Sequence, residues 1–494
     1  MPEGITEKDR QYLAAAGRSP ELLLRQINQL KTSPPSLLGI TAATLQNNGI
    51  KQLSVSEEKQ AIQTYEAECH TKRWTKFVPA SGAASRMFAP FYDFLKQDQE
   101  SSIRQIFESL KRFPFYGIVY AKLMQKREKK IATEKEFIFA FLSEVLDPKG
   151  LGYPDLPKAL IPFFADEKGQ VKTAFEAQIL ETLRLAQQTP VTLHLSISKN
   201  LKAHFETRAK QFLGTLTSSS LPPISLEYSF QHRLTDTPYS GAQGQLIRTS
   251  EGNIAFRKGG HGALLENFNR LDTDCVWIKN VDNILWGTEN QSGERAMQIL
   301  GGYLLTLQST LFSHLNTLET HKEQTELAPI IAFIHSHFDP DYRMTTSKKR
   351  PYEILLDYLN RPLRVCGMIP NKGAKGGGPF WKASARGKSV QIVEGVELNP
   401  LTEEHQKALA ESTHFNPVLM ACGLTNHKGE KFSLYDFRDD HRYMVSTKTH
   451  QNQPITILEW PGLWNGGMAE WNSVFIELSA DTFHPVKTVL DLLR

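Results

Sequence analysis

The fold is decided by residues 76–87, Lys-Phe-Val-Pro-Ala-Ser-Gly-Ala-Ala-Ser-Arg-Met, in which an apolar strand runs directly into a loop of small residues. Backbone N–H groups can converge on an anion in such a loop, because Gly82 and its small neighbours keep side chains out of the way. Arg86 closes the loop and can bind a phosphate through paired hydrogen bonds. The segment therefore predicts a phosphate-binding loop, and tight packing of a strand against a helix is the alternative. The predicted loop consists of Ser81, Gly82, Ala83, Ala84 and Ser85.

Strand-like and helix-like segments alternate through the rest of the chain. Apolar stretches with strand character lie at residues 191–196, 225–230, 275–279, 330–335, 363–369, 390–393, 455–458 and 474–478. Such alternation favours an α/β fold, in which a mixed sheet carries helices on both faces.

Two regions have a helical pattern instead. Residues 1–70 predict a helical N-terminal extension, and residues 89–150 predict a helical insertion, because apolar residues recur there at helical spacing. We expect the α/β core, with this insertion, over residues 71–400. Residues 401–494 are expected to form a C-terminal α/β part.

The composition limits the class of protein. With 494 residues, 40% hydrophobic and 22% charged, the chain has the balance of an ordinary globular protein. A net charge of +4 is too small to favour nucleic acid as a partner. The four cysteines form no close pairs, no apolar run is long enough to span a membrane, and the N-terminus lacks a secretory signal. We therefore expect a cytoplasmic protein with no nucleic-acid or membrane partner, and the sequence leaves its oligomeric state unknown.

Two further segments place candidate ligand-binding residues beside apolar strands. In Pro157-Lys158-Ala159 a lysine precedes an apolar stretch and can direct its ammonium toward a bound phosphate; an ordinary surface lysine is the alternative. Residues 257–262, Arg-Lys-Gly-Gly-His-Gly, place three glycines around His261. Such a turn permits a ligand to approach the backbone closely, so it predicts a binding contact.

A carboxylate follows the strand-like stretch at residues 275–279. Asp282 and Asn283 come next, and an open α/β sheet binds its ligands at the carboxyl ends of its strands. A hard cation such as Mg²⁺ can bridge this carboxylate to phosphate oxygens. Asp-Asn pairs also form turns and helix caps, so a purely structural role is the alternative.

The order of these segments resembles that of the uridylyltransferase type of nucleotidyltransferase, the UDP-sugar pyrophosphorylases. Residues 81–87 stand in the place of that family's glycine-rich loop, and the segment around Lys158 in the place of its Pro-Lys-Gly. The remaining matches follow in the family's order: Gln231, the glycine turn at residues 259–262, Val281-Asp282-Asn283 and Gln391-Ile392-Val393-Glu394. The chain departs from the family in the first loop, where Ala and Ser replace Gly and Thr, and in lacking a counterpart of the family's sugar-side lysine.

The resemblance implies a nucleotide-diphospho-sugar transferase-like fold and a sugar-1-phosphate nucleotidyltransferase. Its substrates would be a nucleoside triphosphate, with UTP expected, and a sugar 1-phosphate. Its cofactor would be Mg²⁺. Residues 401–494 would complete the sugar-binding side. The implied catalytic residues are Arg86, Lys158 and Asp282, of which Asp282 would also hold the metal. The implied nucleotide contacts are Ser81, Gly82, Ala83, Ala84, Ser85, Gln231, Gly260, His261 and Gly262. The implied sugar contacts are Glu394, Asn416 and Asn465.

A second resemblance is closer and covers nearly the whole chain. Two segments are similar in sequence to a bacterial family catalogued as domain of unknown function 4301. They are residues 415–418, Phe-Asn-Pro-Val, and residues 460–466, Trp-Pro-Gly-Leu-Trp-Asn-Gly. This second resemblance implies no particular activity.

Two other functions stay open at this point. A nucleotide-sugar-binding protein without turnover would keep the fold, and the alanines in the first loop favour it. A metal-dependent hydrolase is the other, because His335 and His337 would share one face if the stretch beginning at residue 330 forms a strand.

Overall fold

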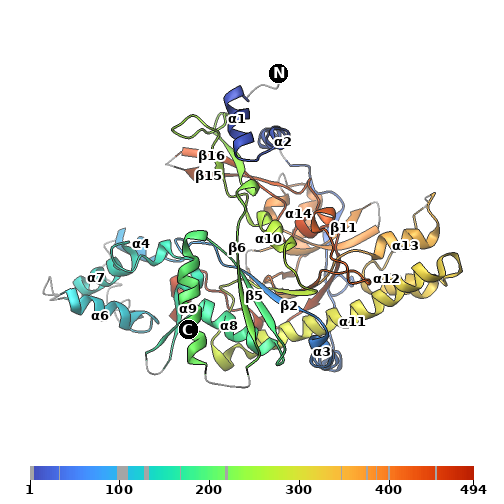
Figure 1. The fold of residues 1–494 in the computed structure, drawn as a ribbon, viewed down its shortest axis with the longest axis horizontal. Helices are drawn as coiled ribbons and strands as arrows, with labels where there is room; N and C mark the ends of the chain where they lie inside the picture. Colours follow the sequence, from blue (N-terminus) through green and yellow to red (C-terminus); the bar gives the residue numbers. More distant parts are fainter. Residues whose placement is uncertain are drawn as a thin grey trace. The chain divides into compact units, whose positions relative to one another are not determined.

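The structure, a computed structural model, describes residues 5–32, 34–96, 109–126, 133–166, 169–216, 221–345, 348–373, 376–384, 387–398, 401–450 and 453–493. The chain divides into two compact units, whose elements are labelled in Figure 1. Unit 1 comprises Met1–Thr75, Phe230–Ile278 and Met297–Ala480. Unit 2 comprises Lys76–Ser229, Lys279–Ala296 and Asp481–Arg494. Each unit draws on three separate segments, and the domain ranges expected from the sequence stay a prediction.

Unit 2 is built on three neighbouring strands in the order β2-β5-β6. They are β2 (Trp74–Pro79), which begins in unit 1, β5 (Val191–Ile197) and β6 (Ile224–Phe230). Phe77 of β2 and Leu193 of β5 are fully buried, as their apolar pattern predicts. A hairpin of β3 (Pro162–Ala165) and β4 (Val171–Thr173) leads into helix α8 (Ala174–Leu185), and α9 (Lys202–Thr215) follows β5. Helix α8 begins with a capping box between Thr173 and Glu176, and nearly all of its residues are buried.

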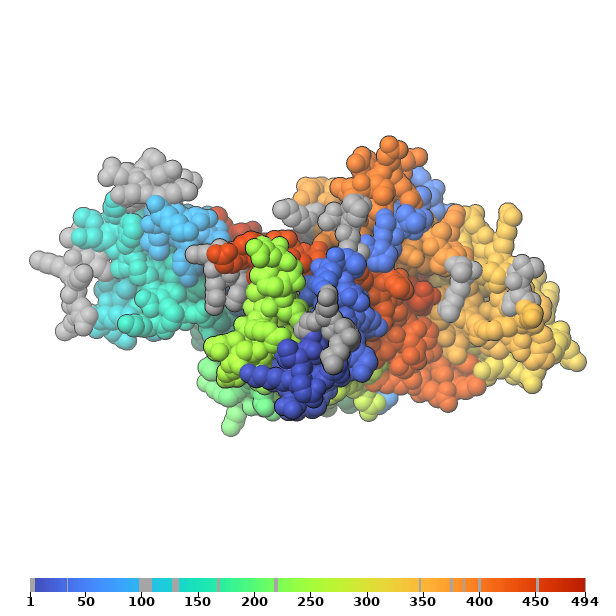
Figure 2. Space-filling model, turned by 90° about the horizontal axis from the view of Figure 1, so that it is seen from above, coloured from blue at the N-terminus to red at the C-terminus, as the bar shows by residue number. Residues whose placement is uncertain are grey.

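The predicted helical insertion is confirmed over its described residues. It consists there of α4 (Ala89–Lys96), α6 (Tyr116–Lys126) and α7 (Glu134–Leu146), whereas residues 97–108 and 127–132 lie outside the described part. These helices form one block, coloured light blue to cyan in Figures 1 and 2. Aromatic rings hold the block together, since Phe113 stacks on Phe115 at 5.2 Å and meets Phe91 edge-on at 5.4 Å between ring centroids.

Unit 1 contains a mixed group of strands in the order β13-β10-β14-β9. These are β13 (His414–Phe415), β10 (Leu363–Pro370), β14 (Met420–Gly423) and β9 (Cys275–Ile278). Strand β10 pairs antiparallel with β13 and β14 and parallel with β17 (Asn472–Glu477), which makes the arrangement mixed, as expected. Both faces of these strands are buried, which is why they read as continuous apolar runs.

Two smaller sheets complete the strands of unit 1. The first has the order β1-β11-β12, and the second has the order β15-β16-β7-β8. Their bounds are β1 (Ile40–Ala42), β11 (Gly378–Ser384), β12 (Gly387–Val393), β15 (Met444–His450), β16 (Gln453–Glu459), β7 (Thr237–Gly241) and β8 (Phe256–Arg257). The remaining helices are α1 (Glu7–Ala15), α2 (Pro20–Lys31), α3 (Val55–Glu68), α10 (Leu265–Asn269), α11 (Gln291–His321), α12 (Ala328–His337), α13 (Pro351–Leu359) and α14 (Glu403–Glu411). The helical character expected for residues 1–70 is thus confirmed, with the short strand β1 added to it.

Every strand expected from the sequence is confirmed except the one at residues 330–335, which was wrong. That stretch belongs to helix α12. Its buried residues Ile330, Phe333 and Ile334 follow helical spacing, and Pro329 stands in the first turn, where a helix tolerates proline. Across the described part of the chain, every helix falls short of the length and apolar character needed to cross a membrane.

Candidate functional site

The predicted anion-binding loop follows β2 and lies beside the segment that carries Lys158. The N–H of Ala84 donates to Leu156 O at 2.8 Å, and the N–H of Lys158 donates to Gly82 O at 3.3 Å. Ala83 forms a β-bridge with Pro157. The first two motifs singled out in the sequence are therefore neighbours in unit 2.

The loop presents hydrogen-bond donors that the protein does not use. The backbone N–H groups of Gly82, Ala83, Ser85 and Arg86 donate to no other described residue. A Cβ added at Gly82 would meet nothing within 4 Å, so packing does not explain the glycine. Arg86 is exposed and makes no ion pair with another described residue. These groups suit an anion, because amide donors without a partner and a guanidinium are the usual ligands of phosphate.

Lys158 and Asp282, which are distant in sequence, meet in an ion pair in unit 2. Lys158 Nζ donates to Asp282 Oδ2 at 2.8 Å and to Val486 O at 2.7 Å. The Asp282 side chain is only 10% exposed. The buried Asp282 carboxylate is therefore paired with Lys158 next to the predicted anion-binding loop.

A segment that the sequence analysis did not single out, residues 484–489, lies against both parts of this site. The N–H of Val486 donates to Asp282 O at 3.0 Å, and the N–H of Val489 donates to Met87 O at 2.8 Å. The N–H of His484 donates to Asn283 Oδ1 at 2.8 Å. No motif marks this segment, because its contribution comes mostly from backbone groups.

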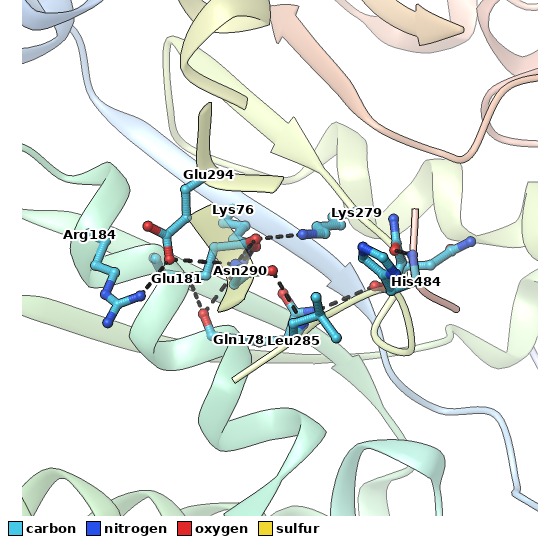
Figure 3. Close-up of polar contacts among 12 residues, drawn as sticks. Lys76, Gln178, Glu181, Arg184, Lys279, Leu285, Asn290, Glu294 and His484 are labelled. Carbon is cyan, nitrogen blue, oxygen red and sulfur yellow. Dashed lines mark hydrogen bonds and ion pairs between the residues drawn. The ribbon is translucent and has the colours of Figure 1, made fainter. Parts of the chain in front are cut away.

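Unit 2 also contains a buried charge network, shown in Figure 3. Lys76 from β2 and Lys279 just after β9 both form ion pairs with Glu181 of α8, and these three side chains are at most 1% exposed. Asn290 Nδ2 also donates to Glu181 Oε1 at 2.7 Å. Burial raises the pKa of Glu181, but Lys279 and Lys76 outweigh this effect and lower it to about 2. Burial lowers the pKa of Lys76 to about 8, against the opposing charge of Glu181.

Gln178 of α8 and Asn290, which lies just before α11, hold the backbone on the two sides of Asp282. Gln178 Nε2 donates to Asn280 O at 3.3 Å and to Val281 O at 3.2 Å, and Asn290 Oδ1 accepts from the N–H of Leu285 at 3.2 Å. Figure 3 shows Gln178 and Glu181 reaching from α8 toward this turn. The backbone around Asp282 is therefore hydrogen-bonded to side chains of unit 2 on both sides.

A cavity of about 620 Å³ opens beside this turn within unit 2. Its lining includes Leu285, Val486, Phe164, Trp286, Arg112 and Arg184. Its volume lies in the range of small-molecule sites, and it mixes aromatic surface with guanidinium groups.

Three other predicted site residues meet in unit 1. The His261 ring stacks on Trp464 at 4.4 Å between centroids, and its Nε2 lies 3.5 Å from Glu394 Oε1. Burial raises the pKa of Glu394, but hydrogen bonds from His261 and Asn465 outweigh it, so the pKa is lowered overall. Asn465 is fully buried, and its Oδ1 accepts no hydrogen bond from a described residue. The glycine turn and the Trp-Pro-Gly-Leu-Trp-Asn-Gly segment thus form one polar cluster.

A buried ion pair supports this cluster and was not predicted. Arg442 Nη2 lies 2.7 Å from Glu397 Oε1, and Arg442 Nη1 donates to Gln391 Oε1 at 3.2 Å. Asn465 Nδ2 donates to Glu397 Oε2 at 3.2 Å. No local pattern could have found it, since its members are polar residues scattered over the chain.

The glycines of the turn at residues 259–262 are explained by packing within the chain. A Cβ at Gly262 would lie 2.1 Å from Pro461 O, and Gly260 has φ +75°, where a Cβ is unfavourable. The close backbone approach predicted for a ligand is made here by the chain itself.

We expect Gly262→Ala to lower the stability of unit 1 by about 1–3 kcal/mol, because the new methyl group has no room beside a backbone carbonyl. Gly82→Ala is the matched control in unit 2 and should change stability by no more than about 0.5 kcal/mol, since its methyl group meets open space. Thermal unfolding of both variants checks this. Equal losses would contradict the assignment of the two glycines to different roles.

Two further predicted contacts in unit 1 have partners of their own. Asn416 donates from Nδ2 to Gly367 O at 2.8 Å and accepts from the N–H of Val418 at 3.0 Å. It thereby stabilises Val418 at φ 61°. Gln231 Nε2 lies 3.5 Å from Thr235 Oγ1. The ligand-binding roles of Asn416 and Gln231 stay predictions.

The histidine pair considered for a metal site lies in the last turn of α12, so the shared face expected from a strand was wrong. Residues two apart on a helix point about 200° apart, so the two rings do not converge. His335 Nε2 lies 2.9 Å from Tyr342 O, and burial lowers the pKa of His337 to about 4. Within the described ranges, no three His, Cys, Asp or Glu side chains are grouped as metal ligands.

Solved structures with a similar arrangement include three pyrophosphorylases. UDP-N-acetylglucosamine pyrophosphorylase from Trypanosoma brucei is 13% identical, with coverage of 100% of this chain and 80% of that one and a TM-score of 0.48. A UDP-glucose pyrophosphorylase mutant from Leishmania major is 12% identical, with coverage of 98% and 78% and a TM-score of 0.44. A putative UDP-N-acetylglucosamine pyrophosphorylase from Entamoeba histolytica is 12% identical, with coverage of 89% and 84% and a TM-score of 0.46. Similarities at this level carry no inference about the chemistry of this chain.

No curated protein matches the sequence. The closer of the two resemblances stated above is confirmed by a family model that matches residues 6–494. The chain therefore belongs to the family described as domain of unknown function DUF4301.

Proposed function

We propose that the protein is a sugar-1-phosphate nucleotidyltransferase, which transfers a nucleoside monophosphate from a nucleoside triphosphate, with UTP expected, to a sugar 1-phosphate. The observation that carries the proposal is the loop after β2, where the backbone N–H groups of residues 82, 83, 85 and 86 have no described acceptor and Arg86 has no described counter-charge. The loop directly adjoins the Lys158–Asp282 pair, so donors and charges for a polyphosphate stand together in unit 2.

The reaction needs little covalent chemistry from the protein. A phosphate oxygen of the sugar 1-phosphate attacks the α-phosphorus, a new P–O bond forms, and the bond between the α-phosphorus and the bridging oxygen breaks as pyrophosphate leaves. Negative charge grows on the leaving group, and fixed donors lower the barrier by stabilising it. In this proposal the loop and Arg86 bind the leaving phosphates, and Lys158 with Asp282 fixes the geometry beside them.

Asp282 offers one carboxylate oxygen to Mg²⁺. Its Oδ2 is engaged by Lys158, whereas its Oδ1 has no partner among the described residues. Mg²⁺ is typically held by one or two carboxylates together with substrate phosphates and waters. When bound, the ion would neutralise phosphate charge, and Asp282 would be its ligand from this chain.

For unit 1 by itself we propose that Gln231, His261, Glu394, Asn416 and Asn465 bind polar groups of a ligand. The cluster of His261, Glu394 and Asn465 supports the polar part of this assignment. The unpartnered Asn465 Oδ1 can accept from a hydroxyl group of a ligand.

Arg86→Ala should lower kcat by roughly a hundredfold while it weakens nucleotide binding much less, because the guanidinium acts most strongly on charge that grows in the transition state. Steady-state kinetics and calorimetry on the same variant separate the two effects. An unchanged kcat in the Arg86→Ala variant would show that Arg86 does not take part in the reaction.

The proposal is tested by a pyrophosphate-release screen of the purified protein with the common nucleoside triphosphates and sugar 1-phosphates in the presence of Mg²⁺. Turnover with any one pair supports a transferase. Binding of nucleotide sugars by calorimetry without any turnover would identify a nucleotide-sugar-binding protein instead, the reading that the alanines in the loop favour. Affinity for neither nucleotides nor nucleotide sugars would refute both functions.

A further inference from the structure

Lys487 places a second ammonium at the Asp282 carboxylate. Its Nζ lies 3.9 Å from Asp282 Oδ2, and its side chain is 59% exposed. This distance is too long for a hydrogen bond, and Lys487 Nζ donates to no other described residue. Its ammonium is therefore attracted to the site while all of its N–H donors remain available to a ligand.

Lys158, which the sequence resemblance assigns to the phosphate, is engaged differently. Its Nζ already donates to Asp282 and to the carbonyl of Val486, and its side chain is 19% exposed. Two of its three donors are thus committed within the protein. Of the two lysines at Asp282, Lys487 is the one that can turn toward an anion without losing a hydrogen bond.

The backbone that carries Lys487 is fixed. Val486 and Val489 are buried on either side of it, and their N–H groups donate to Asp282 O and Met87 O. Asp491 Oδ2 accepts from the N–H of Lys487 at 2.8 Å and from that of Thr488 at 2.7 Å. Because this backbone is already fixed, contact with a ligand requires the ordering of the Lys487 side chain alone.

Charge favours an anionic ligand at this place. Lys158, Lys487 and Arg86 bring three positive charges to this part of unit 2, against two carboxylates: Asp282, which lies near both lysine ammonium groups, and Asp491, which accepts from the backbone N–H of Lys487. The unused backbone N–H groups of the loop lie next to the same segment. Excess positive charge with free donors is the arrangement that binds polyphosphate.

We infer that Lys487 is a ligand-binding residue of this site, whose ammonium contacts the phosphate groups of a nucleotide or of pyrophosphate. The inference deepens the proposed function and rests on it for the identity of the substrate. Binding of pyrophosphate can nevertheless be measured without any turnover.

The experiment is calorimetry of the full chain with inorganic pyrophosphate, with and without Mg²⁺. Lys487→Met should weaken binding about tenfold or more, the effect of losing one charge-assisted hydrogen bond. Lys487→Arg should retain affinity within about threefold. Lys149→Met, which removes an exposed lysine of the same unit with no described side-chain partner, is the control and should bind like the wild type.

Each outcome either supports or overturns the role inferred for Lys487. Equal affinity of Lys487→Met and the wild type, or no binding of pyrophosphate by the wild type, would overturn the inference. A Lys487-dependent affinity in a protein that releases no pyrophosphate from any substrate pair would leave the inference standing and refute the transferase. Turnover together with a pyrophosphate affinity that does not depend on Lys487 would support the transferase and overturn the inference. Matching thermal unfolding midpoints confirm that the variants are folded.

Discussion

Replacement of Glu181 by glutamine should lower the unfolding free energy by about 3–5 kcal/mol. The variant would leave Lys76 and Lys279, which are at most 1% exposed, without the carboxylate that now balances them. Removing one partner of a buried ion pair is strongly destabilising, because the remaining charge stays out of water and unpaired. Urea unfolding of the variant and the wild type measures the difference.

The matched control replaces all three charges. Lys76→Met, Glu181→Leu and Lys279→Met together should restore most of the stability, since a well-packed apolar group often replaces a buried ion pair without loss. A Glu181→Gln protein that loses less than about 1 kcal/mol would show that the lysines reach water in solution.

Asp282→Asn should lower kcat by roughly a hundredfold to a thousandfold, which is the range found for the loss of a preorganised electrostatic group. The substitution keeps the size of the side chain but removes the charge that holds Lys158 and that would hold Mg²⁺. The backbone contact from Asp282 O to Val486 should persist, so the fold is retained. Kinetics as a function of Mg²⁺ concentration give the result.

Asp93→Asn in helix α4 is the control, because Asp93 is exposed and has no described side-chain partner. Unchanged kcat and Mg²⁺ dependence in Asp282→Asn would assign Asp282 to the turn alone. That result would favour the structural role that Asp-Asn pairs often play.

Local patterns were enough to predict most of the fold. Apolar runs bounded by turn residues located the strands, because burial on both faces of a strand leaves a continuous apolar signal. Helix α12 was missed for the same reason, since a short apolar run is ambiguous until its burial is known. The loop after β2 was predicted from its small residues, and its unused backbone donors could be found only from the structure.

The side chains that interact around the candidate site could not be predicted from the sequence. Glu181 joins Lys76 and Lys279 across 105 and 98 residues, and nothing near any of them marks the pairing. Lys487 carries no motif, because a single exposed lysine is typical of any protein surface. The glycine turn was recognised, but its close neighbour is the chain's own Pro461 carbonyl.

The division of unit 2 into three segments has a consequence for the newly made chain. Lys158 and Val486 are hydrogen-bonded across 328 residues, so this contact can form only after nearly all of unit 1 has left the ribosome. Until then Asp282 and the loop after β2 lack the backbone of residues 484–489. Contacts between such distant residues form slowly, and a partly made unit exposes its apolar surface in the meantime. The candidate site should therefore form only once residues 484–489 are available, and refolding chains should gain pyrophosphate affinity later than they gain secondary structure.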